Sequence, residues 1–190
     1  MGVGKDAFGL ALVLLRSQTC GVQTLATRSI VVMGVEGCGK STVGAALARR
    51  LGFSFIEGDD LQPSDNIARM ASGHPLTDAE REPWLQAVGE RLASEPRGAV
   101  AACSALKRAY RDALREYVPS MYSVMLTGSE ALIASRIATR HHTYMPASLL
   151  ESQFSILEPL QGDERGVVVD VSPAPDAIVE RVVQALGRRQ

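Results

Sequence analysis

Cysteine is scarce in this sequence, and neither sign of charge is in excess. The three cysteines, Cys20, Cys38 and Cys103, have the spacing of neither a disulfide framework nor a set of metal ligands. So few thiols are typical of a protein in a reducing compartment, and we expect a cytoplasmic location. The 20 basic and 21 acidic residues leave a net charge of −1. This balance gives no overall basic surface for nucleic acid, so we expect no nucleic-acid partner.

Long hydrophobic runs are also absent. The apolar run at residues 7–15 has nine residues, whereas a membrane-spanning helix needs about 20, so we expect no membrane partner. Lys5 and Arg16 flank this run as in a signal peptide, but no clear cleavage site follows it. We interpret residues 1–28 as an N-terminal extension or leader, with an organelle presequence as the alternative. Residues 29–190 have the length of one domain.

The clearest pattern that the sequence does contain is a phosphate-binding loop. Residues 34–41 read GVEGCGKS, which fits G-x-x-x-x-G-K-[ST]. Glycines there let backbone N–H groups converge on phosphate oxygens. Lys40 would neutralise charge between the β- and γ-phosphates of ATP, and the Ser41 hydroxyl would bind Mg²⁺. The predicted nucleotide site consists of Gly34, Val35, Glu36, Gly37, Cys38, Gly39, Lys40, Ser41 and Thr42.

The elements around this loop support a ligand site over a ligand-free glycine-rich turn. An apolar strand is predicted at 29–33 and an amphipathic helix at 40–51. The N-terminus of that helix would add its partial positive charge to the phosphate site.

Strand and helix patterns alternate along the rest of the chain. Further strands are predicted at 53–57, 98–102, 121–126 and 167–171, and further helices at 64–71, from Pro83 onward, and at 105–117, 129–139, 147–157 and 175–186. Continuously apolar strands joined through helices indicate a parallel sheet covered on both faces. We therefore predict a single-domain α/β fold with a five-stranded parallel sheet. Ligands in such folds bind beyond the carboxyl ends of the strands.

An acidic turn follows the second predicted strand. Glu57 ends that strand, and Asp59 and Asp60 come directly after it. Phosphoryl transfer to an alcohol needs a carboxylate that orients the hydroxyl and accepts its proton. We predict Asp59 as this base, Glu57 as a water-mediated Mg²⁺ ligand and Asp60 as a partner of a substrate hydroxyl. The alternative is a turn in which Asp60 caps the next helix.

Basic residues near the strand ends suggest an anionic substrate. Lys107 and Arg111 are four residues apart on a predicted helix, and Arg69 and Arg81 bracket the irregular segment 61–82. We predict that these four side chains bind the substrate, although such pairs are also common on solvated helix faces.

A second basic pair precedes a break in the helical pattern. Arg136 and Arg140 lie directly before His141, His142 and Thr143. Arginines beside a mobile segment suit stabilisation of a transferring phosphoryl group. We expect Arg136 to contact the nucleotide and Arg140 to act in catalysis, with a solvated helix face as the alternative. The two histidines have no further Cys or His nearby in sequence, so we predict no metal site there.

Six sequence blocks beyond the phosphate loop resemble gluconokinases. They are residues 57–61, 66–70, 73–78, 81–85, 102–112 and 149–154, in order and with consistent spacing. The resemblance implies ATP-dependent phosphorylation of D-gluconate at its 6-hydroxyl with Mg²⁺, in a fold similar to nucleoside monophosphate kinases. It also implies a mobile lid at about 137–147, often a homodimer, and substrate contact by Gln153.

The chain departs from the gluconokinase pattern at two places. The family commonly has His where this chain has Gln62, and Gly-His-Phe where it has residues 141–143. A kinase for another small hydroxy acid or polyol, such as shikimate, is the alternative enzyme. A nucleotide-dependent regulatory module without turnover is the alternative of another class, and the presence of Lys40, Ser41, Asp59 and Arg140 argues against it.

Overall fold

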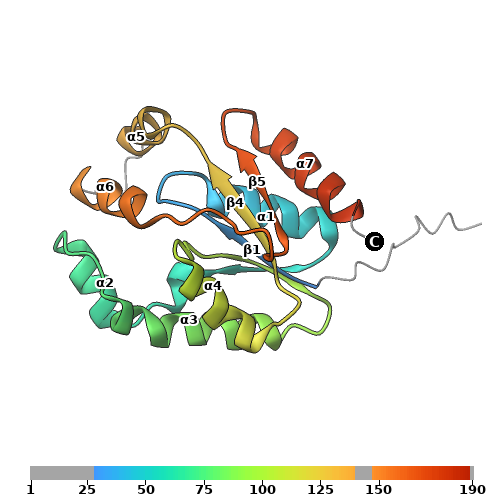
Figure 1. The fold of residues 1–190 in the computed structure, drawn as a ribbon, viewed down its shortest axis with the longest axis horizontal. Helices are drawn as coiled ribbons and strands as arrows, with labels where there is room; N and C mark the ends of the chain where they lie inside the picture. The colour runs from blue at the N-terminus through green and yellow to red at the C-terminus, as the bar shows by residue number, and fades with distance from the viewer. Residues whose placement is uncertain (1–27, 140–146, 189–190) are drawn as a thin grey trace, which may run out of the picture.

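A five-stranded parallel sheet forms the centre of the molecule (Figure 1). The computed structural model describes residues 28–139 and 147–188. Its strands are β1 (Ser29–Met33), β2 (Ser54–Glu57), β3 (Ala99–Ala102), β4 (Tyr122–Thr127) and β5 (Gly166–Asp170). Their order across the sheet is β2-β3-β1-β4-β5, and every neighbouring pair is parallel. The predicted fold class and number of strands are confirmed.

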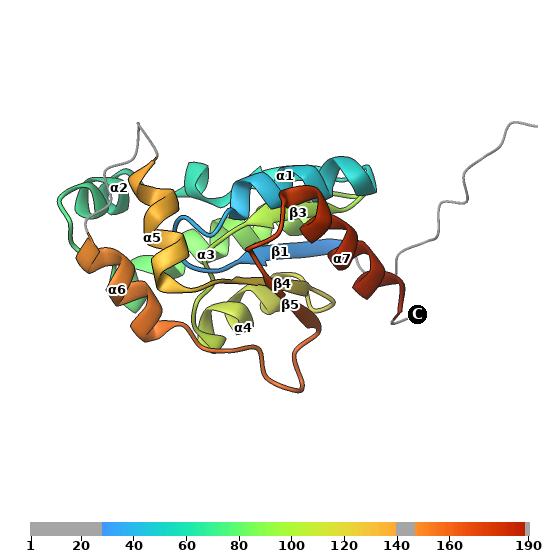
Figure 2. The same ribbon diagram turned by 90° about the horizontal axis from the view of Figure 1, so that it is seen from above.

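Helices cover both faces of this sheet. They are α1 (Lys40–Leu51), α2 (Ser64–Ala71), α3 (Asp78–Ala93), α4 (Arg108–Tyr117), α5 (Glu130–Ala138), α6 (Ala147–Ile156) and α7 (Pro175–Gly187), with a 3₁₀ helix, η1, at Gly58–Leu61. Figure 2 shows α1 and α4 on opposite sides of the strands. Among the helices of the described segments, none is long and apolar enough to cross a membrane.

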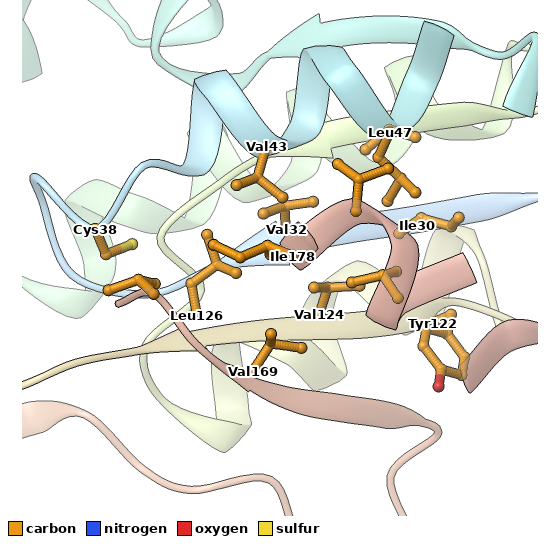
Figure 3. Close-up of a cluster of buried hydrophobic side chains, with 14 of the residues drawn as sticks. Ile30, Val32, Cys38, Val43, Leu47, Tyr122, Val124, Leu126, Val169 and Ile178 are labelled. Atoms are coloured by element: carbon orange, nitrogen blue, oxygen red, sulfur yellow. The ribbon is translucent and has the colours of Figure 1, made fainter. Parts of the chain in front are cut away.

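Two buried clusters follow from the alternation of side chains along β1. Ile30 and Val32 point to the face covered by α1 and α7, where Figure 3 shows them near Val43, Leu47 and Ile178. Val31 and Met33 point to the other face, where Trp84, Leu85 and Val88 of α3 and Tyr110 and Leu114 of α4 pack. Apolar side chains therefore cover both faces of the central strand, β1, as the continuous apolar pattern of the strands predicted.

The prediction that α3 begins at Pro83 is wrong. The helix begins at Asp78, because Thr77 and Glu80 form a capping box. The Thr77 hydroxyl accepts a hydrogen bond from the Glu80 amide, while the Glu80 carboxylate accepts one from the Thr77 amide at 2.7 Å. Pro83 lies inside the helix. This start places Asp78 and Arg81 on the helix that faces the candidate site.

The prediction that α4 begins at Ala105 is wrong as well. The helix begins at Arg108, and Ala105 has a φ of +39°, in the left-handed region that interrupts a right-handed helix. The Ser104 carbonyl instead accepts a hydrogen bond from Gly34 at 3.2 Å. The segment between β3 and α4 thus supports the phosphate loop.

Candidate active site

The phosphate loop, residues 34–41, joins the carboxyl end of β1 to the N-terminus of α1. Gly34 has a φ of +139°, and a Cβ there would lie 2.6 Å from the Leu126 carbonyl oxygen. Gly37 has a φ of +77°, and a Cβ there would lie 2.5 Å from Cγ1 of Ile137. Both positions therefore require glycine for conformation and for space. The Cys38 side chain is buried in the apolar cluster (Figure 3), so this residue contributes its backbone to the loop.

Lys40 lies across the phosphate loop with its side chain almost fully buried. Its Nζ donates a hydrogen bond to the Val35 carbonyl at 3.1 Å and lies 3.6 Å from the Glu36 carboxylate. Burial acts to lower the pKa of Lys40, but interactions with Cys38, Glu36 and Asp59 outweigh it and raise that pKa. The ammonium therefore stays charged at neutral pH, as a phosphate ligand requires.

The structure brings Ser41, Glu57 and Asp59 to the same rim as Lys40. Desolvation raises the pKa of Glu57, and a hydrogen bond with Ser41 partly offsets the shift. Asp59 is reached by solvent, yet enough protein surrounds its carboxylate that desolvation, partly offset by Lys40, raises its pKa. Asp60 is exposed on η1. The acidic turn thus lies beside the phosphate loop, as sequence order and the parallel sheet predicted.

The oxygen atoms of Ser41 and Glu57 are of the kind that Mg²⁺ prefers. Magnesium in kinase sites takes one or two protein oxygens, with substrate phosphates and waters completing an octahedron. In the part of the chain that the structure describes, no group of three or more His, Cys, Asp or Glu side chains could hold a metal by itself. The donor pair fits a magnesium ion that arrives with the nucleotide.

A cluster of charged side chains lies between α3 and α4. The Lys107 Nζ donates to both carboxylate oxygens of Asp78, at 2.8 and 2.9 Å, and the Tyr110 hydroxyl donates to the same carboxylate. The Arg81 guanidinium lies 5.4 Å from the centre of the Tyr110 ring and 3.2 Å from its hydroxyl. The Arg69 side chain donates a hydrogen bond to the Pro75 carbonyl at 3.1 Å and forms an ion pair with Glu80 at 3.4 Å. We call Arg81, Lys107 and Tyr110 the carboxylate cluster, because they already hold one carboxylate.

The prediction that Arg111 binds the substrate is corrected by its burial. Its side chain is 0% exposed, and so is that of Glu164, with which it forms a bidentate ion pair at 2.6 and 2.7 Å. Its remaining donors bond the carbonyls of Ala105, Leu106, Glu158 and Pro159. No donor of Arg111 is left for a ligand, so this residue anchors α4 to the segment before β5.

Gln153 and Arg136 form hydrogen bonds with backbone groups of the protein that the sequence did not indicate. The Gln153 side-chain oxygen accepts a hydrogen bond from the Glu36 amide at 2.6 Å, so α6 contacts the phosphate loop directly. Arg136 donates to the Val171 carbonyl at 2.7 Å from α5. Substrate binding by Gln153 and nucleotide contact by Arg136 stay predictions. Arg140, His141, His142 and Thr143, with most of the predicted lid, lie outside the described residues.

Three residues of this region are not among the predicted site residues: Tyr110, Asp78 and Trp84. Tyr110 lies three residues after Lys107, the residue that precedes α4, and this short spacing is the sequence signal that links the two. Asp78 would have been found from the capping box of Thr77 and Glu80, which marks the start of α3. The contact of Trp84 with η1, described below, has no sequence signal because it joins separate elements.

Comparison with known proteins identifies the family. A family model described as an AAA domain matches residues 30–160. A gluconokinase of Gluconobacter oxydans (strain 621H) is 43% identical over 163 residues, which cover 84% of this chain and 92% of that protein. The chain belongs to the gluconokinase family.

Solved structures agree with this membership. The crystal structure of a gluconokinase from Sinorhizobium meliloti 1021 has a TM-score of 0.79 and 51% identity, and the match covers 84% of this chain and 91% of that one. Shikimate kinase from Aquifex aeolicus matches with a TM-score of 0.55 but only 17% identity, which is a likeness of fold alone. The shikimate alternative is therefore not favoured.

Proposed function

We propose that this chain transfers the γ-phosphoryl group of ATP to the 6-hydroxyl of D-gluconate. The observation that carries the proposal is that α3 links the carboxylate cluster to the acidic turn: Arg81 contacts Tyr110, and Trp84, three residues later, bonds Gly58 directly before Asp59. Lys40, Ser41 and Asp59 supply the transfer chemistry, and Lys107 with Arg81 supplies charge for an acidic acceptor. Membership of the gluconokinase family supports the same substrate.

The chain's own residues divide the work of the transfer. The backbone of the phosphate loop and the N-terminus of α1 bind the phosphates. Lys40 neutralises charge that develops on the β- and γ-phosphates in the transition state. Asp59 orients the acceptor hydroxyl and accepts its proton, while Asp60 holds a further hydroxyl of the substrate. A bound Mg²⁺, held through Ser41 and by way of water through Glu57, would neutralise phosphate charge.

The contact between Asp78 and the carboxylate cluster indicates how the substrate carboxylate would be held. Two N–H bonds from Lys107 and one O–H bond from Tyr110 reach the Asp78 carboxylate. These bonds lower the pKa of Asp78, as expected for donors that favour an anion. Gluconate would offer the same chemical group and would compete with Asp78 for these donors.

Lys107→Met should lower kcat/KM for gluconate by about ten- to a hundred-fold, the usual effect of losing one charge-assisted contact. The six-carbon alditol has no carboxylate, so its weak use should stay unchanged. Arg91→Met is the matched control, since Arg91 is an exposed cation of α3 that pairs with Glu95. An equal loss of kcat/KM for gluconate and for the alditol in Lys107→Met would show that the carboxylate cluster does not bind the substrate carboxylate.

An acceptor panel in a coupled ADP-release assay tests the proposed function. Gluconate, the six-carbon alditol, shikimate and no acceptor are compared at equal ATP and Mg²⁺. We expect gluconate to give the highest kcat/KM and the reaction without acceptor to be slow. Preference for shikimate, or ADP release that does not depend on any acceptor, would contradict the proposal.

Three further expectations accompany this function. The free thiols of Cys38 and Cys103 suit a reducing compartment, which supports the proposed cytoplasmic location. Assembly as a homodimer and independent folding of residues 29–190 stay predictions.

A further inference from the structure

Trp84, the only tryptophan in the chain, contacts the acidic turn from α3. Its side chain is buried, and its indole Nε1–H donates a hydrogen bond to the Gly58 carbonyl at 2.7 Å. Gly58 is the first residue of η1, and Asp59 and Asp60 follow it. A buried indole that bonds a backbone carbonyl constrains that carbonyl strongly, because an unmade bond there would cost free energy.

The backbone of η1 is restrained on its other sides too. A Cβ at Gly58 would lie 2.3 Å from the Ala102 carbonyl oxygen, so the main chain packs directly against the end of β3. The Gln62 amide donates to the Asp59 carbonyl at 3.2 Å and closes the turn. The Gly58 carbonyl and the Asp59 amide belong to one planar peptide unit. The Trp84 bond therefore sets the orientation of the unit that precedes the Asp59 side chain.

We propose that Trp84 is a positioning residue for phosphoryl transfer. Its indole N–H holds the peptide unit before Asp59 and thereby aims the Asp59 carboxylate at the acceptor hydroxyl. The inference rests on the proposed function, which assigns Asp59 as the base. A displacement of about 1 Å at a reacting group can cost about a hundred-fold in rate, so a bond that fixes this turn has a measurable effect on turnover.

The position of Trp84 on α3 also joins the turn to the carboxylate cluster. Arg81 is three residues earlier on the same helix, and residues with this spacing share a helix face. Arg81 contacts Tyr110, while Trp84 contacts Gly58. One rigid helix therefore fixes the distance between the group that binds the acid and the turn that carries the base.

Trp84→Phe keeps an aromatic ring in the core and removes the N–H donor. We expect kcat for gluconate to fall by about ten- to a hundred-fold with little change in KM for ATP. Val88→Ala is the matched control, because Val88 is buried on the same helix and packs in the same cluster. It should lower the melting temperature without lowering kcat. An unchanged kcat in folded Trp84→Phe would overturn the inference.

A double-mutant cycle separates positioning from a general structural effect. If Trp84 acts through Asp59, Trp84→Phe should have little further effect on kcat in an Asp59→Asn background. An equal fold-loss in both backgrounds would overturn the inference. The wild-type rate is measured alongside, and failure of the wild type to use gluconate would contradict the proposed function instead.

The single indole N–H also gives a test that needs neither turnover nor a folded variant. In ¹⁵N-labelled wild-type protein, Trp84 gives the only indole resonance. We expect slow hydrogen exchange at this group and a shift of its resonance when Mg²⁺, ADP and gluconate are added. Rapid exchange, or no shift at saturating ligand, would overturn the inference.

Discussion

Replacing Asp59 with Asn should lower kcat for gluconate by about 10²–10⁴-fold, the usual range for loss of a general base. The amide keeps the shape and one acceptor oxygen but loses the negative charge and the basicity. Asp59 lies close enough to Lys40 for their charges to interact, which is where a base near the γ-phosphate must be. ATP binding should change little. Steady-state kinetics with both substrates varied, together with nucleotide titration, measures these effects.

Asp60→Asn is the matched variant for this prediction, because it makes the same chemical change one residue away. Asp60 is exposed on η1 and is assigned to a substrate hydroxyl. The substitution should raise KM for gluconate and leave kcat nearly unchanged. If Asp60→Asn abolishes turnover while Asp59→Asn barely affects it, the roles of the two acids are reversed.

Arg111→Ala should destabilise the fold by about 3–5 kcal/mol, because it leaves the buried Glu164 carboxylate without its main partner. Both side chains are fully buried, so Glu164 would lose these bonds at a site that bulk water does not reach. Chemical denaturation of the variant and the wild type gives the difference in the free energy of unfolding. Arg108→Ala, which removes two more exposed ion pairs, with Asp112 and Asp163, should have a much smaller effect. A loss in Arg111→Ala no larger than in Arg108→Ala would show that the buried pair does not anchor α4.

The same ion pair predicts a dependence of stability on acid pH. Burial acts to raise the pKa of Glu164, but bonds from Arg111, the Gln161 amide and Arg115 outweigh it and lower the pKa from 4.5 to about 2. A carboxyl with a lowered pKa stabilises the fold fully above its ordinary pKa and loses this contribution as the pH falls toward the folded value. The wild type should therefore lose stability between about pH 4.5 and 2, and Arg111→Ala should lose less over that window.

The parts of the site that sequence predicted well depend on local patterns and on one topological rule. The residues of the phosphate loop follow from the glycines and from the strand and helix beside them. The position of Glu57 and Asp59 near Lys40 follows because parallel strands present their carboxyl ends at one edge. The structure places these residues as expected.

The parts that sequence did not predict depend on which elements pack together. The spacing of Lys107 and Arg111 suggested one shared face, but Lys107 precedes α4 and Arg111 is covered by the segment that contains Glu164. No local sequence pattern indicates that this segment covers Arg111. The contact of Trp84 with Gly58 is equally remote, because the partners are 26 positions apart in the sequence. Such contacts are set by tertiary packing, which overrides what a single helix pattern indicates.

Transfer of labelled phosphate is the most direct test of the central claim. The protein is incubated with γ-³²P-labelled ATP, Mg²⁺ and gluconate, and the label is followed into the sugar acid, with Lys40→Ala as the matched control. We predict that the wild type moves the label to the 6-hydroxyl of gluconate and that folded Lys40→Ala moves almost none, because the charge between the β- and γ-phosphates is no longer neutralised. Label released only as inorganic phosphate by the wild type, or equal transfer by both proteins, would contradict the account.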